Sequence, residues 1–185
     1  MTFEDMGLSP RFQPADRFDL RATLIPLPDV TAELWMGGSH TVVGEPIEAA
    51  QLAGCWLVDC AGELPVAIHS AAAAYIPRVF EDIEQTPPQY DRVLQLAASL
   101  ADVLRGGAVD LASGGPPRSE DASLLERERP WRIYVLCKQG FNRSALMTGR
   151  IMRALGLPGE FVVSEIRRHR RGALANDAFE RLLRE

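Results

Sequence analysis

The sequence predicts an α/β fold in which helices flank a central, mostly parallel mixed sheet, and three observations support this class. The 185 residues, 46% hydrophobic and 24% charged, suit one globular domain that buries a core without disulfides or metals. Apolar runs of strand length alternate with helical segments along most of the chain. The last part of the sequence, after this alternation, predicts a run of helices. Alternating strands and helices place helices against parallel strands, so this order predicts a layered architecture.

The beginning of the chain is predicted to be extended. Prolines interrupt residues 1–30, which are expected to form an arm with one edge strand near residues 21–27. Residues 34–36 predict a short strand that ends in a turn at the glycine pair 37–38. Residues 46–53 predict a short helix, because a proline occupies its first turn.

Two more strands and a long helix are predicted next. Residues 55–59 form an apolar run of strand length between glycines, and residues 75–80 are a further strand candidate. From Tyr90 to Leu104 the apolar residues recur at helical spacing on one face. The glycine pair at 106–107 ends this predicted helix.

Residues 106–130 are rich in Gly, Pro and charged residues and predict a surface insertion, so residues 31–185 are expected to form a single domain that contains it. Residues 131–137 then have the β-branched and aromatic composition of a buried strand. This strand leads into a turn at Gly140.

Three helices are predicted after this turn. The first has an apolar face and ends before Pro158; its apolar positions are Thr148, Ile151, Met152 and Leu155. The second covers residues 160–169. The third begins after Asn176 or Asp177 as the N-cap, with Glu180 behind it.

Composition excludes several classes of protein. The net charge is −9 over residues 1–142 and +4 over residues 143–185, which does not suit a nucleic-acid clamp but favours a phosphorylated ligand near the basic part. No apolar run is long enough for a membrane span, and residues 1–10 lack a secretory signal, so a cytoplasmic location is expected. The three cysteines lack both disulfide and metal-ligand spacing.

The most informative segment is residues 137–144, between a predicted strand and a predicted helix. Cys137 precedes Arg143 by six residues, so its sulfur can face the amides and the dipole at the helix N-terminus, which favour a thiolate. Gly140 lets the loop curl so that its amides point inward, and Arg143 can hold two phosphate oxygens at once. The segment therefore predicts a phosphate cradle with a nucleophile at its base.

This Cys-x5-Arg-Ser signature resembles that of the cysteine-dependent protein tyrosine and dual-specificity phosphatases. Residues 34–40 look like the early strand and turn of that family, residues 76–82 like the strand that leads to its acid loop, and residues 167–183 like its C-terminal helices. The resemblance implies a dual-specificity-phosphatase-like fold. It also implies hydrolysis of phosphomonoesters without a metal or cofactor.

The resemblance assigns roles to the signature residues. Cys137 would attack phosphorus to form a phosphocysteine, Arg143 would hold the equatorial oxygens, and Ser144 would ease departure of the thiolate. The rest of the cradle would bind phosphate; it consists of Lys138, Gln139, Gly140, Phe141 and Asn142.

A leaving alkoxide or phenoxide needs a proton, and Asp82 is the preferred general acid. It follows the strand candidate 75–80 and precedes the helix from Tyr90, as the acid loop of the family does. Three neighbouring carboxylates remain alternatives: Glu81, Glu84 and Asp91.

Other polar residues receive weaker hypotheses. Asp59, at a strand end, either lines the pocket or caps a turn, and Cys55 and Cys60 are expected to pack at the same strand. His40 and His69 have no visible partner, and His169 is expected on a solvated face of an arginine-rich helix. Four arginines near the C-terminus are candidates for steering an anionic substrate: Arg167, Arg168, Arg170 and Arg171.

Several functions remain open. Leu136 stands where the family commonly has His, which keeps open a phosphate-binding module without turnover. Residues 140–143 resemble the RNA 5′-triphosphatase branch, and Lys138 resembles the lysine-bearing cradles of phosphoinositide phosphatases. A rhodanese-type sulfurtransferase also uses Cys in an anion-binding loop, but it does not require the Arg-Ser pair. The expected partner is a phosphorylated substrate, most readily a phosphoprotein, with a lipid or nucleotide as alternatives.

Overall fold

The computed structural model contains a five-stranded mixed sheet. It describes residues 22–30, 32–38, 54–62, 64, 66, 70–106, 130 and 132–185. The strands are β1 (Thr23–Ile25), β2 (Glu33–Gly38), β3 (Cys55–Asp59), β4 (Ala74–Pro77) and β5 (Arg132–Cys137), in the order β1-β2-β5-β3-β4. β1 pairs with β2 antiparallel, and every other neighbouring pair is parallel. The predicted mostly parallel mixed sheet is confirmed.

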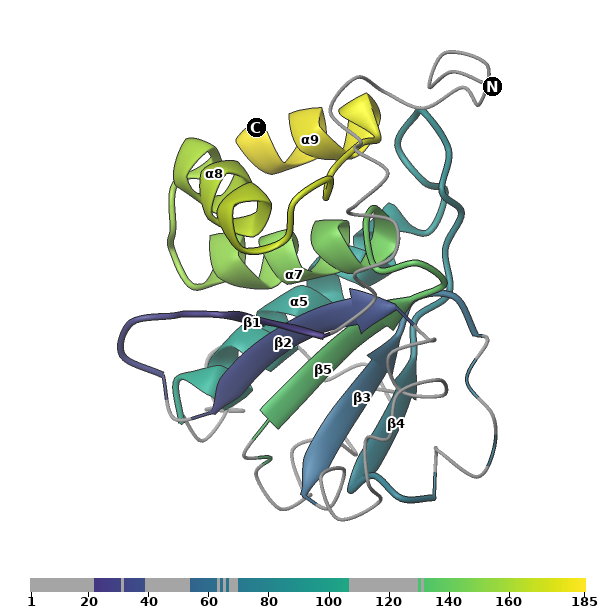
Figure 1. Cartoon of the computed structure of the whole chain (residues 1–185), viewed down its shortest axis with the longest axis vertical. Helices are drawn as coiled ribbons and strands as arrows, with labels where there is room; N and C mark the ends of the chain where they lie inside the picture. The colour runs from purple at the N-terminus through teal and green to yellow at the C-terminus, as the bar shows by residue number, and fades with distance from the viewer. Residues whose placement is uncertain are drawn as a thin grey trace.

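The described residues include four helices, which lie on one side of this sheet. They are α5 (Tyr90–Leu104), α7 (Arg143–Ala154), α8 (Gly159–His169) and α9 (Asp177–Arg184). Their apolar residues form one core cluster with one face of the sheet, and Figure 1 shows α7 over the sheet with α8 and α9 beyond it. No helix in the described part of the chain is long and apolar enough to cross a membrane.

The alternation of side chains along β5 determines on which face of the sheet Cys137 lies. The side chains of this strand alternate between faces, because successive residues of a strand point in opposite directions. Ile133, Val135 and Cys137 belong to the core under the helices, whereas Tyr134 and Leu136 belong to a small cluster on the other face. The alternation therefore places the Cys137 side chain on the face where α7 begins.

Most of the predicted elements are confirmed. The strand at residues 55–59 and the helix from Tyr90 to Leu104 have the predicted bounds, and the edge strand near residues 21–27 is β1. The last three helices also lie where they were predicted. The predicted helix 46–53 lies outside the described residues, as do most of the predicted arm and of the insertion 106–130.

Two strand predictions were wrong in extent. Gly37 and Gly38 do not form a turn but continue β2 beside Leu136 and Cys137. The strand predicted at residues 75–80 is β4, which ends at Pro77. Beyond it the chain still follows the end of β3, where the Arg78 amide donates to the Asp59 carbonyl at 2.8 Å. The ladder ends because the chain leaves the sheet to form a loop.

Candidate active site

The C-terminal ends of the parallel strands form the edge at which α/β sheets commonly bind ligands. β5 ends there at Cys137, and α7 begins at Arg143, so residues 138–142 form the β5–α7 loop. This loop borders a cavity of about 330 Å³. The cavity is lined by Asp82, Cys137, Lys138, Gln139, Phe141, Asn142 and Arg143. The fold thus gathers most of the predicted site residues around one cavity.

Cys137 lies at the base of this cavity and is only 4% exposed. The Gly140 amide donates a hydrogen bond to Cys137 Sγ at 3.2 Å, and Ser144 Oγ lies 3.3 Å from the same sulfur. Amide and hydroxyl groups at these distances can stabilise negative charge on sulfur. The arrangement suits a cysteine that reacts as a thiolate.

Arg143 supplies a donor for a bound anion. Its Nε atom is buried and has no hydrogen-bond partner among the described residues. A buried guanidinium N–H without a partner is costly, so an oxyanion beside it would relieve that cost. Arg143 is also the first residue of α7, whose N-terminal amides favour an anion.

Gly140 is required by the close packing of the β5–α7 loop against β2. Its φ is +76°, and a Cβ atom there would lie 2.3 Å from the Gly37 carbonyl carbon. A Cβ on Gly38 would lie 2.9 Å from the Gln139 carbonyl carbon. Gly38 of β2 is therefore part of the site together with Gly140, because the absence of a side chain at both positions lets the loop fold back over the end of β2.

Arg170 holds the same loop from outside, which corrects its assignment as a steering residue. It is 4% exposed, and its Nε donates to the Gly140 carbonyl at 2.5 Å. Its Nη2 donates to the Gln139 carbonyl at 3.4 Å, and its Nη1 to Thr23 Oγ1 at 3.0 Å. These bonds turn two loop carbonyls toward Arg170, so the steering hypothesis was wrong for this residue.

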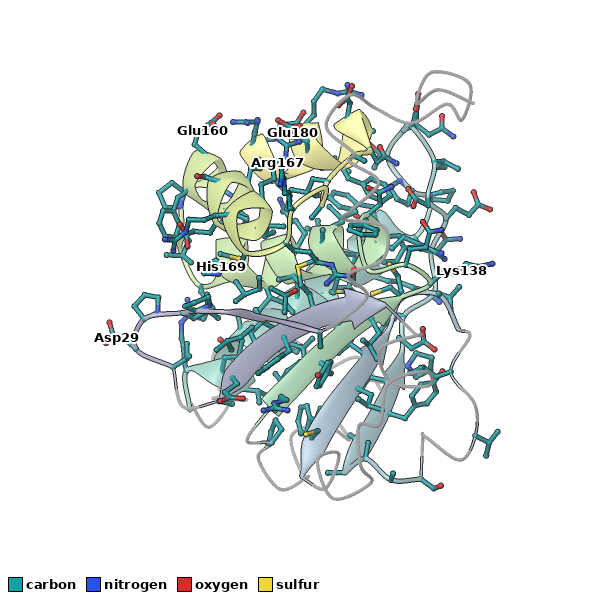
Figure 2. All side chains as sticks on the ribbon, viewed as in Figure 1. Asp29, Lys138, Glu160, Arg167, His169 and Glu180 are labelled. Atoms are coloured by element: carbon teal, nitrogen blue, oxygen red, sulfur yellow. The ribbon has the colours of Figure 1, made fainter. Side chains whose placement is uncertain are left out.

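Two of the other arginines considered for steering make ion pairs among the C-terminal helices. Arg167 lies against Glu180 at 2.5 Å, and Figure 2 shows this pair between α8 and α9. Arg168 donates to Glu165 at 2.7 Å within α8. The first contact joins two helices, the second stays within one, and neither residue lines the cavity.

Asp82 lines the cavity opposite the β5–α7 loop. Its Oδ2 accepts a hydrogen bond from Asn142 Nδ2 at 3.1 Å, and its Oδ1 accepts one from Asn176 Nδ2 at 2.9 Å. Of the four carboxylates considered for the acid, Asp82 is the one that lines the cavity. All four side chains are exposed, but the three others do not line the cavity: Glu81, Glu84 and Asp91.

Asp59 caps the turn after β3. It is 1% exposed and accepts hydrogen bonds from the amides of Ala61, Gly62 and Leu64. Tyr75 donates to it at 3.0 Å. Of its two predicted roles, the capping role is confirmed.

Cys55 and Cys60 are buried at this strand, as predicted, and neither is suited to be a nucleophile. Burial raises the pKa of Cys55 to about 11, and it raises the pKa of Cys60 well above its usual range, with Cys137 and Asp59 adding to the rise. Both remain protonated thiols at neutral pH.

Lys138 is exposed at the cavity, and Figure 2 shows it at the margin of the molecule with its side chain directed outward. His40 and His69 lie outside the described residues, and His169 Nε2 lies 3.4 Å from Glu165. Within the described part of the chain, no group of three His, Cys, Asp or Glu side chains is placed to hold a metal ion.

Sequence reasoning missed the loop-holding role of Arg170 and the contact between Asn176 and Asp82. The pattern around residues 176–180 offered Asn176 or Asp177 as the N-cap of α9 but gave no signal for the contact with Asp82. Arg170 gave no signal either, because its partners in the loop are backbone carbonyls. The positive-φ glycine at position 140 was the local feature that sequence reasoning did find.

The structure resembles solved protein tyrosine and dual-specificity phosphatases, whereas no protein-family model and no curated protein matches the sequence significantly. A Leishmania major protein assigned as a protein tyrosine phosphatase superposes with a TM-score of 0.61 at 20% identity, over 89% of this chain and 97% of that one. The PTP-2 phosphatase of Cydia pomonella gives 0.56 at 19%, over 89% of both chains.

The human tyrosine phosphatase-like serine/threonine/tyrosine-interacting protein also gives a TM-score of 0.56, at 13% identity over 89% of this chain and 93% of that one. These matches cover nearly the whole chain rather than the cavity alone. The chain therefore has the fold of the protein tyrosine and dual-specificity phosphatases, and the predicted fold class is confirmed.

Proposed function

We propose that this protein is a cysteine-dependent phosphatase of dual-specificity type that hydrolyses phosphomonoesters through a phosphocysteine intermediate. The observation that carries the proposal is the surroundings of Cys137 Sγ. The sulfur lies at the base of the cavity, within hydrogen-bond distance of Gly140 N and Ser144 Oγ. Arg143, whose buried Nε has no hydrogen-bond partner among the described residues, lines the same cavity, so the cavity combines a nucleophile with donors for the oxygens of one phosphoryl group.

In the first step the Cys137 thiolate attacks phosphorus, and the bond between phosphorus and the leaving oxygen breaks. Arg143 and the first amides of α7 hold the phosphoryl oxygens, whose charge they stabilise. Asp82 donates its proton to the leaving oxygen, which departs as an alcohol or phenol. The product of this step is a phosphocysteine with Asp82 ionised.

In the second step water attacks the phosphocysteine, and the phosphorus–sulfur bond breaks. Asp82 accepts the proton that the water loses. The Ser144 hydroxyl donates a hydrogen bond to the departing sulfur, which returns to the thiolate form. Inorganic phosphate leaves, and the site regains its initial protonation state.

The test compares Cys137→Ser with Cys55→Ser on p-nitrophenyl phosphate, because both variants make the same chemical change at a buried cysteine. Cys137→Ser should abolish turnover but keep phosphate binding, since the donors remain. Inorganic phosphate or vanadate should therefore still raise its Tm. Cys55→Ser should retain turnover, and EDTA should have no effect on the wild type. Full activity in Cys137→Ser, or EDTA-sensitive activity restored by a metal, would refute the mechanism.

A phosphate-binding protein without turnover is the second candidate, and Leu136 favours it. This residue precedes the nucleophile, and its side chain packs on the far face with Leu57, Leu64 and Tyr134. It therefore adds no polar group to the cradle. Wild-type protein that binds phosphate but fails to hydrolyse p-nitrophenyl phosphate would establish this candidate.

A further inference from the structure

Both asparagines of the 185-residue chain contact the same carboxylate. Asn142, from the β5–α7 loop, donates to one oxygen of Asp82, and Asn176, from the start of α9, donates to the other. The two asparagines are also joined to each other, since the Asn176 amide donates to Asn142 Oδ1 at 3.1 Å. Three separate segments therefore meet at Asp82.

The Asn142 side chain makes these contacts instead of the capping hydrogen bond that an asparagine at the start of a helix usually makes. Asn142 is the N-cap residue of α7, a position at which asparagine normally accepts a hydrogen bond from the first turn of its own helix. Its side chain makes no such cap, and it contacts Asp82 and the Asn176 backbone instead. The first amides of α7 are thereby left open toward the cavity.

The orientation of the Asn176 side chain is fixed by its own helix. Its Oδ1 accepts hydrogen bonds from the amides of Ala178 and Phe179, so it is the cap of α9. The Nδ2 must then face the opposite way, where it donates to Asp82 Oδ1 and to the Ile83 carbonyl, both at 2.9 Å. All four hydrogen-bonding positions of this amide are used, and the residue is 6% exposed.

The segment that carries Asp82 needs such support. Residues 78–89, the β4–α5 loop, contain no helix or strand, and Asp82 itself is exposed. An exposed side chain on an irregular loop has many conformations, and proton donation requires one of them. The two amides select that conformation.

We propose that Asn142 and Asn176 are positioning residues that hold Asp82 over Cys137 for proton transfer to the leaving group. The proposal rests on the proposed phosphatase function. It assigns the tip of α9 a role in the reaction, because this helix terminus fixes the acid loop. It also couples the cradle to the acid, since Asn142 belongs to the loop that binds phosphate.

Two variants each remove one of the side-chain hydrogen bonds to Asp82 while keeping the fold. Asn176→Ser keeps an oxygen that caps α9 but removes both Nδ2 donors, because serine caps about as well as asparagine. Asn142→Ala removes the second donor. Asp177→Ala is the matched control, since it weakens the same end of α9 without removing a donor to Asp82.

The readout is kcat on two esters, phosphotyrosine and p-nitrophenyl phosphate, whose leaving groups differ in their need for a proton. Asn176→Ser should lower kcat for phosphotyrosine by about 10- to 100-fold and for p-nitrophenyl phosphate by less than about threefold. In an Asp82→Ala background the same change should have no further effect, because its target is gone. Asp177→Ala should leave the ratio of the two kcat values unchanged.

NMR order parameters of the backbone of residues 81–84 supply a readout that does not depend on turnover. They should fall toward the range of a flexible loop in Asn176→Ser compared with wild type, while the amides of Ala178 and Phe179, which can donate to the capping oxygen that serine keeps, stay protected from hydrogen exchange. Equal kcat losses on both esters, or a further loss in the Asp82→Ala background, would overturn the positioning role while the phosphatase function stands. If wild type hydrolyses neither ester, the phosphatase function fails. Unchanged order parameters at residues 81–84 in Asn176→Ser would overturn the positioning role whether or not the protein is a phosphatase.

Discussion

Strands β3 and β5 are parallel neighbours that end at the same edge of the sheet. The backbone amides of the turn after β3 are bound by a carboxylate of the protein, whereas the loop after β5 has no such carboxylate among its own residues. After β3, the Asp59 carboxylate accepts hydrogen bonds from the amides of Ala61, Gly62 and Leu64, so a side chain of the turn itself occupies these donors. After β5, the Gly140 amide contacts Cys137 Sγ, and the loop carbonyls are drawn aside by Arg170. A turn that encloses its own carboxylate is structural, whereas a turn that keeps its donors open can bind an anion from solution.

The two aspartates of this edge show the same contrast. Asp59 is 1% exposed and is bound mostly by backbone amides of its own turn. Asp82 is exposed and is bound by side-chain amides from two distant segments, Asn142 and Asn176. The first contacts hold a turn together. The second hold a carboxylate over a cavity and leave it accessible to a ligand.

The largest expected effect concerns Asp82. If this residue protonates the leaving oxygen, Asp82→Ala should lower kcat for an alkyl or tyrosyl phosphate by roughly 10² to 10⁴. The loss should be much smaller for an activated aryl ester, because a good leaving group departs without a proton. The measurement is kcat over a series of aryl phosphates of increasing leaving-group pKa.

The controls for this series are the neighbouring carboxylates. Glu81→Ala, Glu84→Ala and Asp91→Ala should keep the wild-type dependence on the leaving group. If one of them shows the steeper dependence instead, the acid is misassigned. If none of the four variants does while wild type turns over, the enzyme works without a side-chain acid, and a triphosphatase-like reaction is favoured.

Asp59→Ala should lower the stability of the fold rather than kcat. It leaves three amides without their acceptor, and we expect a loss of about 3 kcal/mol in the free energy of unfolding. For a chain of this size that loss lowers Tm by roughly 6–12 °C. Asp59→Asn keeps one acceptor oxygen and should lose less. A large fall in kcat at a temperature where Asp59→Ala is folded would contradict the structural assignment.

The smallest expected effect concerns Lys138, the cation that the open loop carries at its mouth. Lys138→Ala should reduce kcat/KM for a multiply charged substrate, such as a phosphoinositide or a triphosphate end, about fivefold more than for a singly phosphorylated aryl ester. Arg181→Ala, which removes an exposed charge that does not line the cavity, is the control. Equal effects of Lys138→Ala on both substrates would show that Lys138 does not select substrate charge.

The sequence predicted the open loop well because its chemistry is local. Cys137, Gly140 and Arg143 lie within seven residues, between a strand and a helix that hydrophobic periodicity identifies. The spacing alone brings the sulfur to the helix N-terminus. The same reasoning gave α5 its bounds and narrowed the N-cap of α9 to Asn176 or Asp177, because both features depend on neighbours along the chain.

The sequence by itself thus determined the order of the elements and the position of the candidate nucleophile and candidate cradle between β5 and α7. Only the tertiary structure decided that Asp82 meets Asn176 across 94 residues, that Arg170 holds a carbonyl 30 residues away, and that Gly37 and Gly38 continue a strand. These contacts depend on how helices and loops pack on the sheet, and no local periodicity records a partner that distant. The β5–α7 loop gets its shape from its own residues and its support from the whole fold.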